Sequence, residues 1–306
     1  MSRFLRTASA TLATAGLIAL AGCASADPLS TSETDAESSS GDSIVIGSQD
    51  YYSNEIIAEI YAQALEAEGL TVDRQFRIGQ REAYLPEIEA GSIDLFPEYS
   101  GPLLQYWGGE ADASTSEDVY AELQATVPEG LRVLDQSPAT DQDSYVVTQE
   151  FADEWDLETI ADLANVTEPL TLGANSEAET RPNGPIGLKE VYGVDAEFTP
   201  IEDGGGPLTV QALKDGDIQL AIIYTADPSI AQNGLVSLED PEGLFLASHV
   251  VPLASENVSD EAAAIIDEIS AAMVPEDLIG LNVRSVEEEL PAADIAADWL
   301  TEKGLV

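Results

Sequence analysis

Cysteine and histidine are almost absent from this sequence, which has one of each among its 306 residues. One cysteine cannot form a disulfide within the chain, so the stability of the fold must come from its apolar cores. With His249 as the only histidine, a histidine-rich metal site is excluded and a His-based catalytic triad has little support. No HExxH, GxSxG or Walker sequence occurs, and residues 204–206 (Gly-Gly-Gly) lack the Lys-Ser/Thr of a phosphate loop and predict a turn. We therefore expect no catalysis, no cofactor and no metal; a hydrolase that uses two carboxylates is the enzymatic alternative.

Basic residues are also scarce, because 11 Lys and Arg face 58 Asp and Glu, for a formal net charge of −47. Such a charge argues against nucleic acid and against anionic membrane patches as partners. The acidic residues are spread along the chain, which favours solvated surfaces suited to high salt. A field that steers cationic ligands is the alternative interpretation.

The third feature in short supply is a long apolar run. Two arginines precede the short apolar run 8–21, which is too short for a stable membrane anchor. The run ends in Leu20-Ala-Gly-Cys23, which resembles the bacterial lipobox, in which the signal is cut before the cysteine and the thiol is lipidated. We expect residues 1–22 to be a lipoprotein signal peptide, Cys23 to carry a lipid, and residues 23–43 to be a flexible tether to the outer face of the cell membrane. A plain secretory signal with an incidental cysteine is the alternative.

A nine-residue pattern occurs twice, as Gly91-Ser-Ile-Asp-Leu-Phe-Pro-Glu-Tyr99 and Gly216-Asp-Ile-Gln-Leu-Ala-Ile-Ile-Tyr224. Each copy predicts a glycine that ends a helix, a buried strand, and a tyrosine at the carboxyl end of that strand. Strand-ending glycines precede both copies at nearly equal distances, at Gly47 and Gly173. The pattern indicates two similar α/β lobes, each directing a tyrosine toward a shared crevice.

The order of predicted elements takes the chain from one lobe to the other near residue 145 and back near residue 250. We expect an α/β fold of two lobes with a central cleft and two crossings, the type II architecture of periplasmic binding proteins. The first lobe is predicted to hold residues 44–144 and 250–306, and the second residues 145–249. Ser53 and Ser116 are the expected N-caps of the first lobe's helices that begin near residues 55 and 117.

Several short sequences, in order and spacing, resemble the osmoprotectant-binding proteins of ABC importers, the glycine betaine/carnitine/choline type. They are Val45-Ile-Gly-Ser48, residues 91–101, Arg181-Pro-Asn-Gly184, Gln211-Ala-Leu-Lys-Asp-Gly-Asp217 and Tyr224-Thr-Ala-Asp227. The resemblance covers residues 44–306. It implies an extracytoplasmic, monomeric protein that binds a small zwitterionic or cationic osmolyte and works with an ABC permease and ATPase.

The resemblance also implies a set of ligand-binding residues. A trimethylammonium group has no N–H to donate, so such proteins hold it against aromatic ring faces. Carried over by position, the binding residues are Gln49, Tyr99, Asp143, Tyr145, Arg181 and Tyr224, with Arg181 as the partner of a ligand carboxylate. Packing roles for the tyrosines, and an ion pair between lobes for Arg181, are the alternatives.

This sequence departs from the family pattern at two positions. Ser248 and His249 stand where the family has a fourth tyrosine and join the predicted ligand-binding residues, and Pro102 stands where a threonine is usual. The aromatic box is therefore altered, and a compatible solute such as ectoine or proline is an alternative ligand. A ligand-binding sensor or adhesion lipoprotein without a transporter is another alternative function.

Overall fold

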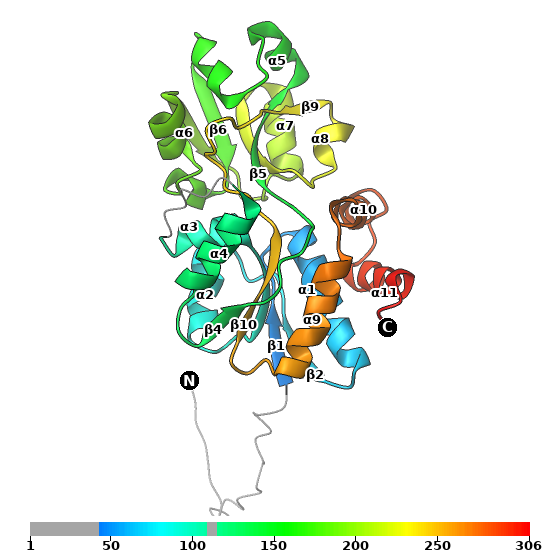
Figure 1. The fold of residues 1–306 in the computed structure, drawn as a ribbon. Helices are drawn as coiled ribbons and strands as arrows, with labels where there is room; N and C mark the ends of the chain where they lie inside the picture. Colours follow the sequence, from blue (N-terminus) through cyan, green and yellow to red (C-terminus); the bar gives the residue numbers. More distant parts are fainter. Residues whose placement is uncertain (1–42, 109–114) are drawn as a thin grey trace, which may run out of the picture. The chain divides into compact units, whose positions relative to one another are not determined.

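The computed structural model describes residues 43–108 and 115–306, which form two five-stranded sheets with helices around each (Figure 1). The expected signal peptide, Cys23 and tether lie outside the described residues, apart from Ser43. The first sheet has the order β2 (Thr71–Gln75), β1 (Ser43–Gly47), β3 (Leu95–Tyr99), β10 (Val250–Ser255) and β4 (Leu131–Val133). The second has the order β7 (Ala196–Pro200), β6 (Leu170–Ala174), β8 (Leu220–Tyr224), β5 (Asp143–Thr148) and β9 (Leu235–Ser237). We call each sheet with its helices a lobe.

The two sheets share one topology. In each, three strands run parallel and the fourth, β10 or β5, pairs antiparallel with the strand that carries the repeated pattern. Both copies of the pattern form the expected strand, β3 ending at Tyr99 and β8 ending at Tyr224. The internal repeat in the sequence is therefore a repeat of structure.

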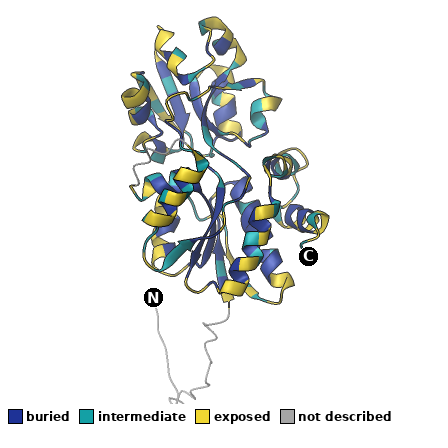
Figure 2. Ribbon diagram, in the orientation of Figure 1, coloured by how far each residue is buried: buried dark blue, intermediate teal, exposed yellow. Residues whose placement is uncertain are grey.

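Helices cover both faces of the sheets, so the central strands are buried on both sides (Figure 2). Around the first sheet lie α1 (Tyr52–Ala67), α2 (Arg81–Glu89), α3 (Ser100–Tyr106), α4 (Ser116–Thr126), α9 (Asp260–Ala272), α10 (Pro275–Val286) and α11 (Ala292–Lys303). Around the second lie α5 (Gln149–Trp155), α6 (Pro185–Tyr192), α7 (Pro207–Asp215), α8 (Ser229–Gln232) and two 3₁₀ helices, Ile160–Asn165 and Ser176–Glu179. Strand β3 shows the principle: Leu95 and Tyr99 pack in one core and Phe96 in the core on the opposite face. Such strands have no polar face, which explains their nearly continuous apolar sequences.

Two helix starts differ from the prediction. Helix α1 begins at Tyr52, with Tyr51 as its N-cap, so Ser53 lies inside the first turn. Helix α4 is capped by Thr115, whose hydroxyl accepts a hydrogen bond from the Asp118 N–H at 3.2 Å, and not by Ser116. In both places a neighbouring residue took the extended backbone conformation that an N-cap needs.

Two extended segments connect the lobes, one between β4 and β5 and the other between β9 and β10. They run side by side, because Thr140 and His249 form an isolated antiparallel bridge and the Val250 N–H donates to the Ala139 carbonyl at 3.1 Å. This pair of segments is the floor of the space between the lobes. No helix in the described ranges is long and apolar enough to cross a membrane.

Candidate functional site

A small cavity of about 20 Å³ lies between the lobes, above the crossing segments. Its walls come from the loops and helix starts after β1, β2 and β3, from the second lobe, and from both crossings. The lining residues are Gln49, Tyr51, Gln80, Arg81, Tyr99, Pro102, Asp141, Asp143, Arg181, Tyr224 and Ser248. Two adjoining cavities, one of about 210 Å³, share the walls formed by Asp143 and Arg181. The site therefore lies at the carboxyl ends of the strands, where open α/β sheets bind ligands.

Six of the predicted binding residues lie together on this cavity: Gln49, Tyr99, Asp143, Arg181, Tyr224 and Ser248. The other two do not line it. Tyr145 is fully buried in the second lobe, where its hydroxyl donates to the Asn183 carbonyl at 2.9 Å and its ring packs edge-on against Phe245. His249 forms a hydrogen bond between its Nδ1 and the Ser137 carbonyl oxygen, 2.9 Å apart. Tyr145 therefore packs in the core of the second lobe, and a ligand contact by this residue stays a prediction.

Three tyrosine rings meet in the cavity. Tyr51, which the prediction missed, donates its hydroxyl to the hydroxyl of Tyr99 at 2.6 Å, and both side chains are buried. Its ring lies 5.0 Å from the half-buried ring of Tyr224, with the planes tilted by 31°. Burial is the main reason that the pKa values of Tyr51 and Tyr99 are raised well above normal, so both hydroxyls stay neutral.

Two arginines line the cavity, and each is already paired with a glutamate. Arg81 and Glu98 form a buried two-pronged ion pair, with Nε to Oε1 at 2.8 Å and Nη2 to Oε2 at 3.0 Å. Burial opposes the charge of Arg81, but the attraction of Glu98 prevails and its pKa is raised. Glu98 also accepts hydrogen bonds from the Tyr84 hydroxyl at 2.5 Å and the Tyr99 N–H at 2.8 Å, which explains why a glutamate precedes the tyrosine in the first repeat.

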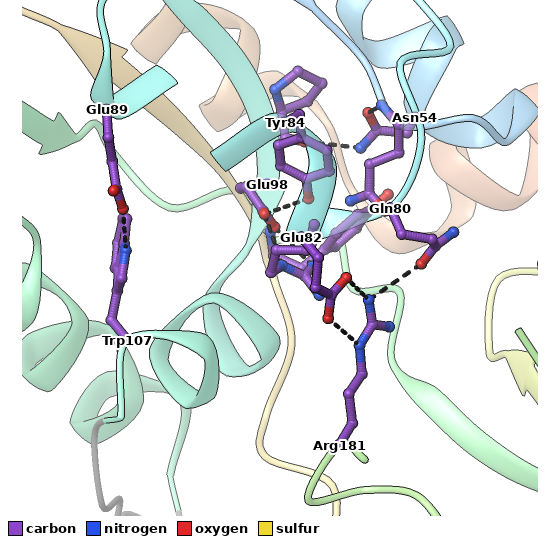
Figure 3. Close-up of polar contacts among 12 residues, drawn as sticks. Asn54, Gln80, Glu82, Tyr84, Glu89, Glu98, Trp107 and Arg181 are labelled. Atoms are coloured by element: carbon purple, nitrogen blue, oxygen red, sulfur yellow. Dashed lines mark hydrogen bonds and ion pairs between the residues drawn. The ribbon is translucent and has the colours of Figure 1, made fainter. Parts of the chain in front are cut away.

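Arg181 reaches from the second lobe to the first, as Figure 3 shows. Its Nε and Nη2 donate to Glu82 at 3.0 and 2.7 Å, and Nη2 also reaches Gln80 at 3.3 Å. Burial raises the pKa of Glu82, but the hydrogen bond and charge of Arg181 outweigh it, so the pKa is lowered. The ion pair between lobes that was an alternative for Arg181 is therefore present, although the same side chain also lines the cavity.

Two further polar side chains, Gln49 and Asp143, complete the site. Gln49 is 4 % exposed, its backbone N–H is fixed by the Asn54 side chain at 2.8 Å, and its side-chain Nε2 finds no hydrogen-bond acceptor among the described residues. A buried donor in this state costs free energy that a ligand oxygen can recover. Asp143 accepts a hydrogen bond from Asn183 Nδ2 at 2.7 Å, and burial raises its pKa. Within the described ranges, no three or more His, Cys, Asp or Glu are grouped to hold a metal ion.

The sequence matches a family model, the substrate-binding domain of ABC-type glycine betaine transport systems, over residues 42–302. The chain belongs to this family. It is 24% identical to the glycine betaine-binding protein YehZ of Escherichia coli K12 over 85% of this chain and 90% of that protein. It is also 24% identical to the carnitine transport binding protein OpuCC of Listeria monocytogenes (serotype 1/2a, strain 10403S), over 87% of this chain and 88% of that one.

The fold is also similar to solved structures of this family. A crystal structure of a glycine betaine/carnitine/choline ABC transporter protein aligns with a TM-score of 0.68 at 20% identity, over 86% of this chain and 99% of that one. The predicted two-lobe α/β fold is therefore confirmed. So is the predicted resemblance to osmoprotectant-binding proteins of ABC importers, a family of substrate-binding proteins rather than enzymes.

Proposed function

We propose that this protein captures a small osmolyte with a methylated ammonium group, such as glycine betaine, choline or carnitine, and presents it to an ABC permease. The observation that carries the proposal is the meeting of Tyr51, Tyr99 and Tyr224 in one cavity between the lobes. Each ring face attracts such a cation by about 0.5–2 kcal/mol, more when water is excluded. The position of the fourth family tyrosine is taken by Ser248, and Tyr51 supplies a third ring in place of Tyr145.

A trimethylammonium group is larger than the water-sized space in this cavity, so the lobes must part to admit it. The paired crossing segments are suited to act as the hinge. Closure then removes water around the cation and strengthens each electrostatic contact. The permease would recognise the closed form.

We further propose that the protein works outside the cytoplasm, held to the membrane through a lipid on Cys23, as a monomer. Conversion of Cys23→Ser would release it from the membrane if the lipid is the anchor. Neighbouring genes for a permease and an ATPase would separate transport from a sensor or adhesion role.

The direct test is calorimetric titration of the protein with glycine betaine, choline, carnitine, proline and ectoine at low and high salt. We expect stoichiometric binding of at least one methylated ammonium compound, without turnover. If only proline or ectoine binds, the ligand is one of these alternative solutes and not a methylated ammonium compound. Release of product from a glycoside or ester would instead support the carboxylate-pair hydrolase.

Arg181 allows a sharper test of how a ligand carboxylate is held. We expect Arg181→Ala to weaken the binding of glycine betaine by about tenfold or more, because a charge-assisted hydrogen bond is worth roughly 1.5–3 kcal/mol. Choline has no carboxylate, so its affinity should change less than about threefold in the same titration.

The matched control is Glu82→Gln, which weakens the ion pair between lobes but keeps the guanidinium. If Glu82→Gln lowers the affinity for glycine betaine as much as Arg181→Ala does, the ion pair and not a ligand contact explains the effect.

A further inference from the structure

Asp141 has an unusual position for a carboxylate. It lies in the first crossing segment, where its backbone N–H donates to the Ser248 carbonyl at 3.3 Å and its own carbonyl accepts from the Ser248 hydroxyl at 2.9 Å. Its side chain is 4 % exposed and lines the cavity beside the three tyrosine rings. The carboxyl group is thus held at the floor of the cleft by the backbone of the two crossing segments.

The side chain of Asp141 lacks a positive partner. Oδ1 accepts the Ala226 N–H at 3.0 Å, and across residues 43–108 and 115–306 no hydrogen bond or ion pair reaches Oδ2 of this cavity-lining side chain. A buried carboxylate in this state is costly unless a cation joins it.

The surrounding groups do not supply that cation. Two further acids lie close enough to oppose ionisation of Asp141, namely Asp143 on β5 and Asp227 in the turn after β8. The neighbouring hydroxyls belong to Tyr51, Tyr52, Tyr99 and Tyr224, from α1 and its cap, β3 and β8. The cavity's two guanidinium groups, Arg81 and Arg181, are bound to Glu98 and Glu82. A bound cation is therefore the group that would complete the surroundings of Asp141.

We propose that Asp141 is the residue that makes this site select a cationic head group over a neutral group of the same shape, and that Asp141 gives up its proton to solvent as the cation binds. This inference rests on the proposed function. The tyrosine faces attract the cation, and the carboxylate supplies a full opposite charge in contact with it. A neutral isostere would fill the rings equally well but would leave Asp141 protonated.

The burial of Asp141 and its acidic neighbours also affect the pKa of its carboxyl group. Burial raises the pKa of Asp141 to about 8, with Asp227 and Asp143 adding to the increase and the Ala226 N–H opposing it. Near neutral pH the empty site is therefore mostly protonated, whereas a bound cation favours the ionised form. Binding must then release a proton and strengthen as the pH rises, by up to about tenfold for each pH unit, until it levels off above about pH 8.

The experiment is titration calorimetry with choline from pH 6 to 9, in pairs of buffers that differ in ionisation heat, so that released protons are counted. We expect release approaching one proton near pH 6.5 and almost none at pH 9. The neutral isostere 3,3-dimethyl-1-butanol should bind at least about tenfold more weakly at pH 8.5 and release no proton.

Asp141→Asn keeps the acceptor for the Ala226 N–H and removes the charge. We expect this variant to bind choline at pH 8.5 about tenfold or more weakly and to show no pH dependence of choline affinity. Its affinities for choline and for the neutral isostere should also differ less than those of the natural protein. Asp267→Asn is the matched control: its pKa is also raised by burial, but it accepts the Asp135 N–H at 2.9 Å and does not line the cavity. It should keep the proton release of the natural protein.

The possible failures are distinct. If the natural protein binds choline or glycine betaine without releasing a proton and with equal affinity at pH 6 and 8.5, Asp141 does not act as proposed while the proposed function stands. The proton count needs no variant, so this result is decisive even if Asp141→Asn folds poorly. If no methylated ammonium compound binds at all, the proposed function falls and this inference falls with it.

Discussion

We expect replacement of Arg81 by Met to lower the free energy of unfolding by about 3–5 kcal/mol, because it leaves the charge of Glu98 buried without an opposite charge. Glu98 has no exposed side-chain surface, and Arg81 provides two of the four hydrogen bonds that its carboxylate accepts. The methionine side chain preserves much of the packing of the arginine stem, so the cost reports mainly the unpaired charge. Urea denaturation at pH 7, followed by circular dichroism, measures it.

Two companion variants isolate the cause. In Arg81→Met/Glu98→Gln the buried charge is gone, and we expect recovery of a large part of the lost stability. Arg77→Met removes a pair with Glu55 in which the arginine side chain is 58% exposed, so it should cost less than about 1 kcal/mol. Equal losses in Arg81→Met and Arg77→Met would show that the buried pair contributes no more than a surface pair.

The sequence predicted the strands of the fold, but it did not predict which side chains pair inside it, and the ion pair of Arg81 and Glu98 shows why. The two copies of the repeated pattern identified β3 and β8, their shared topology and the tyrosines at their ends, since apolar runs after a helix-ending glycine have few other structures available. The partner of Glu98 could not be predicted in this way. Arg81 lies 17 residues earlier in the chain and meets Glu98 only after α2 packs on the sheet.

The site has the same division between predictable and unpredictable residues. Tyr51 precedes a helix in a loop without periodicity, and its ring is fixed by a hydroxyl 48 residues away on Tyr99. Asp141 is one of 58 acidic residues, and only its place on a crossing segment distinguishes it. Acidic and aromatic residues next to a predicted crossing are the sequence signal that could have drawn attention to it.

Tyr145 illustrates how strand geometry limits prediction by position. Asp143 and Tyr145 point to the same face of β5 but lie about 6.6 Å apart along it, since each residue of a strand adds roughly 3.3 Å. Asp143 reaches the cavity, whereas Tyr145 is far enough along the strand to pack in the apolar core of the second lobe. A shift of two residues therefore separates a residue that lines the cavity from one in the core.

Among the tyrosines of the cavity, the largest effect on binding is expected for Tyr224→Ala. Tyr224 ends β8 and is half-buried, so its ring can cover a ligand that lies between the lobes. Loss of one desolvated ring face is worth about 1.4 kcal/mol or more, which corresponds to about tenfold weaker binding of choline or glycine betaine. The second lobe should remain folded, because the ring lies at the carboxyl end of the strand and outside the core of that lobe.

Two conservative variants determine whether the ring itself is responsible. The Tyr224 hydroxyl makes no hydrogen bond with any residue that the structure describes, so Tyr224→Phe should stay within about threefold of the natural affinity in the same calorimetric titration. Tyr145→Phe removes a buried hydroxyl bound to two carbonyls, so we expect it to lower the melting temperature but leave the affinity unchanged. Unchanged affinity in a folded Tyr224→Ala variant would contradict the aromatic box, and a large loss in Tyr145→Phe would return Tyr145 to the set of ligand-binding residues.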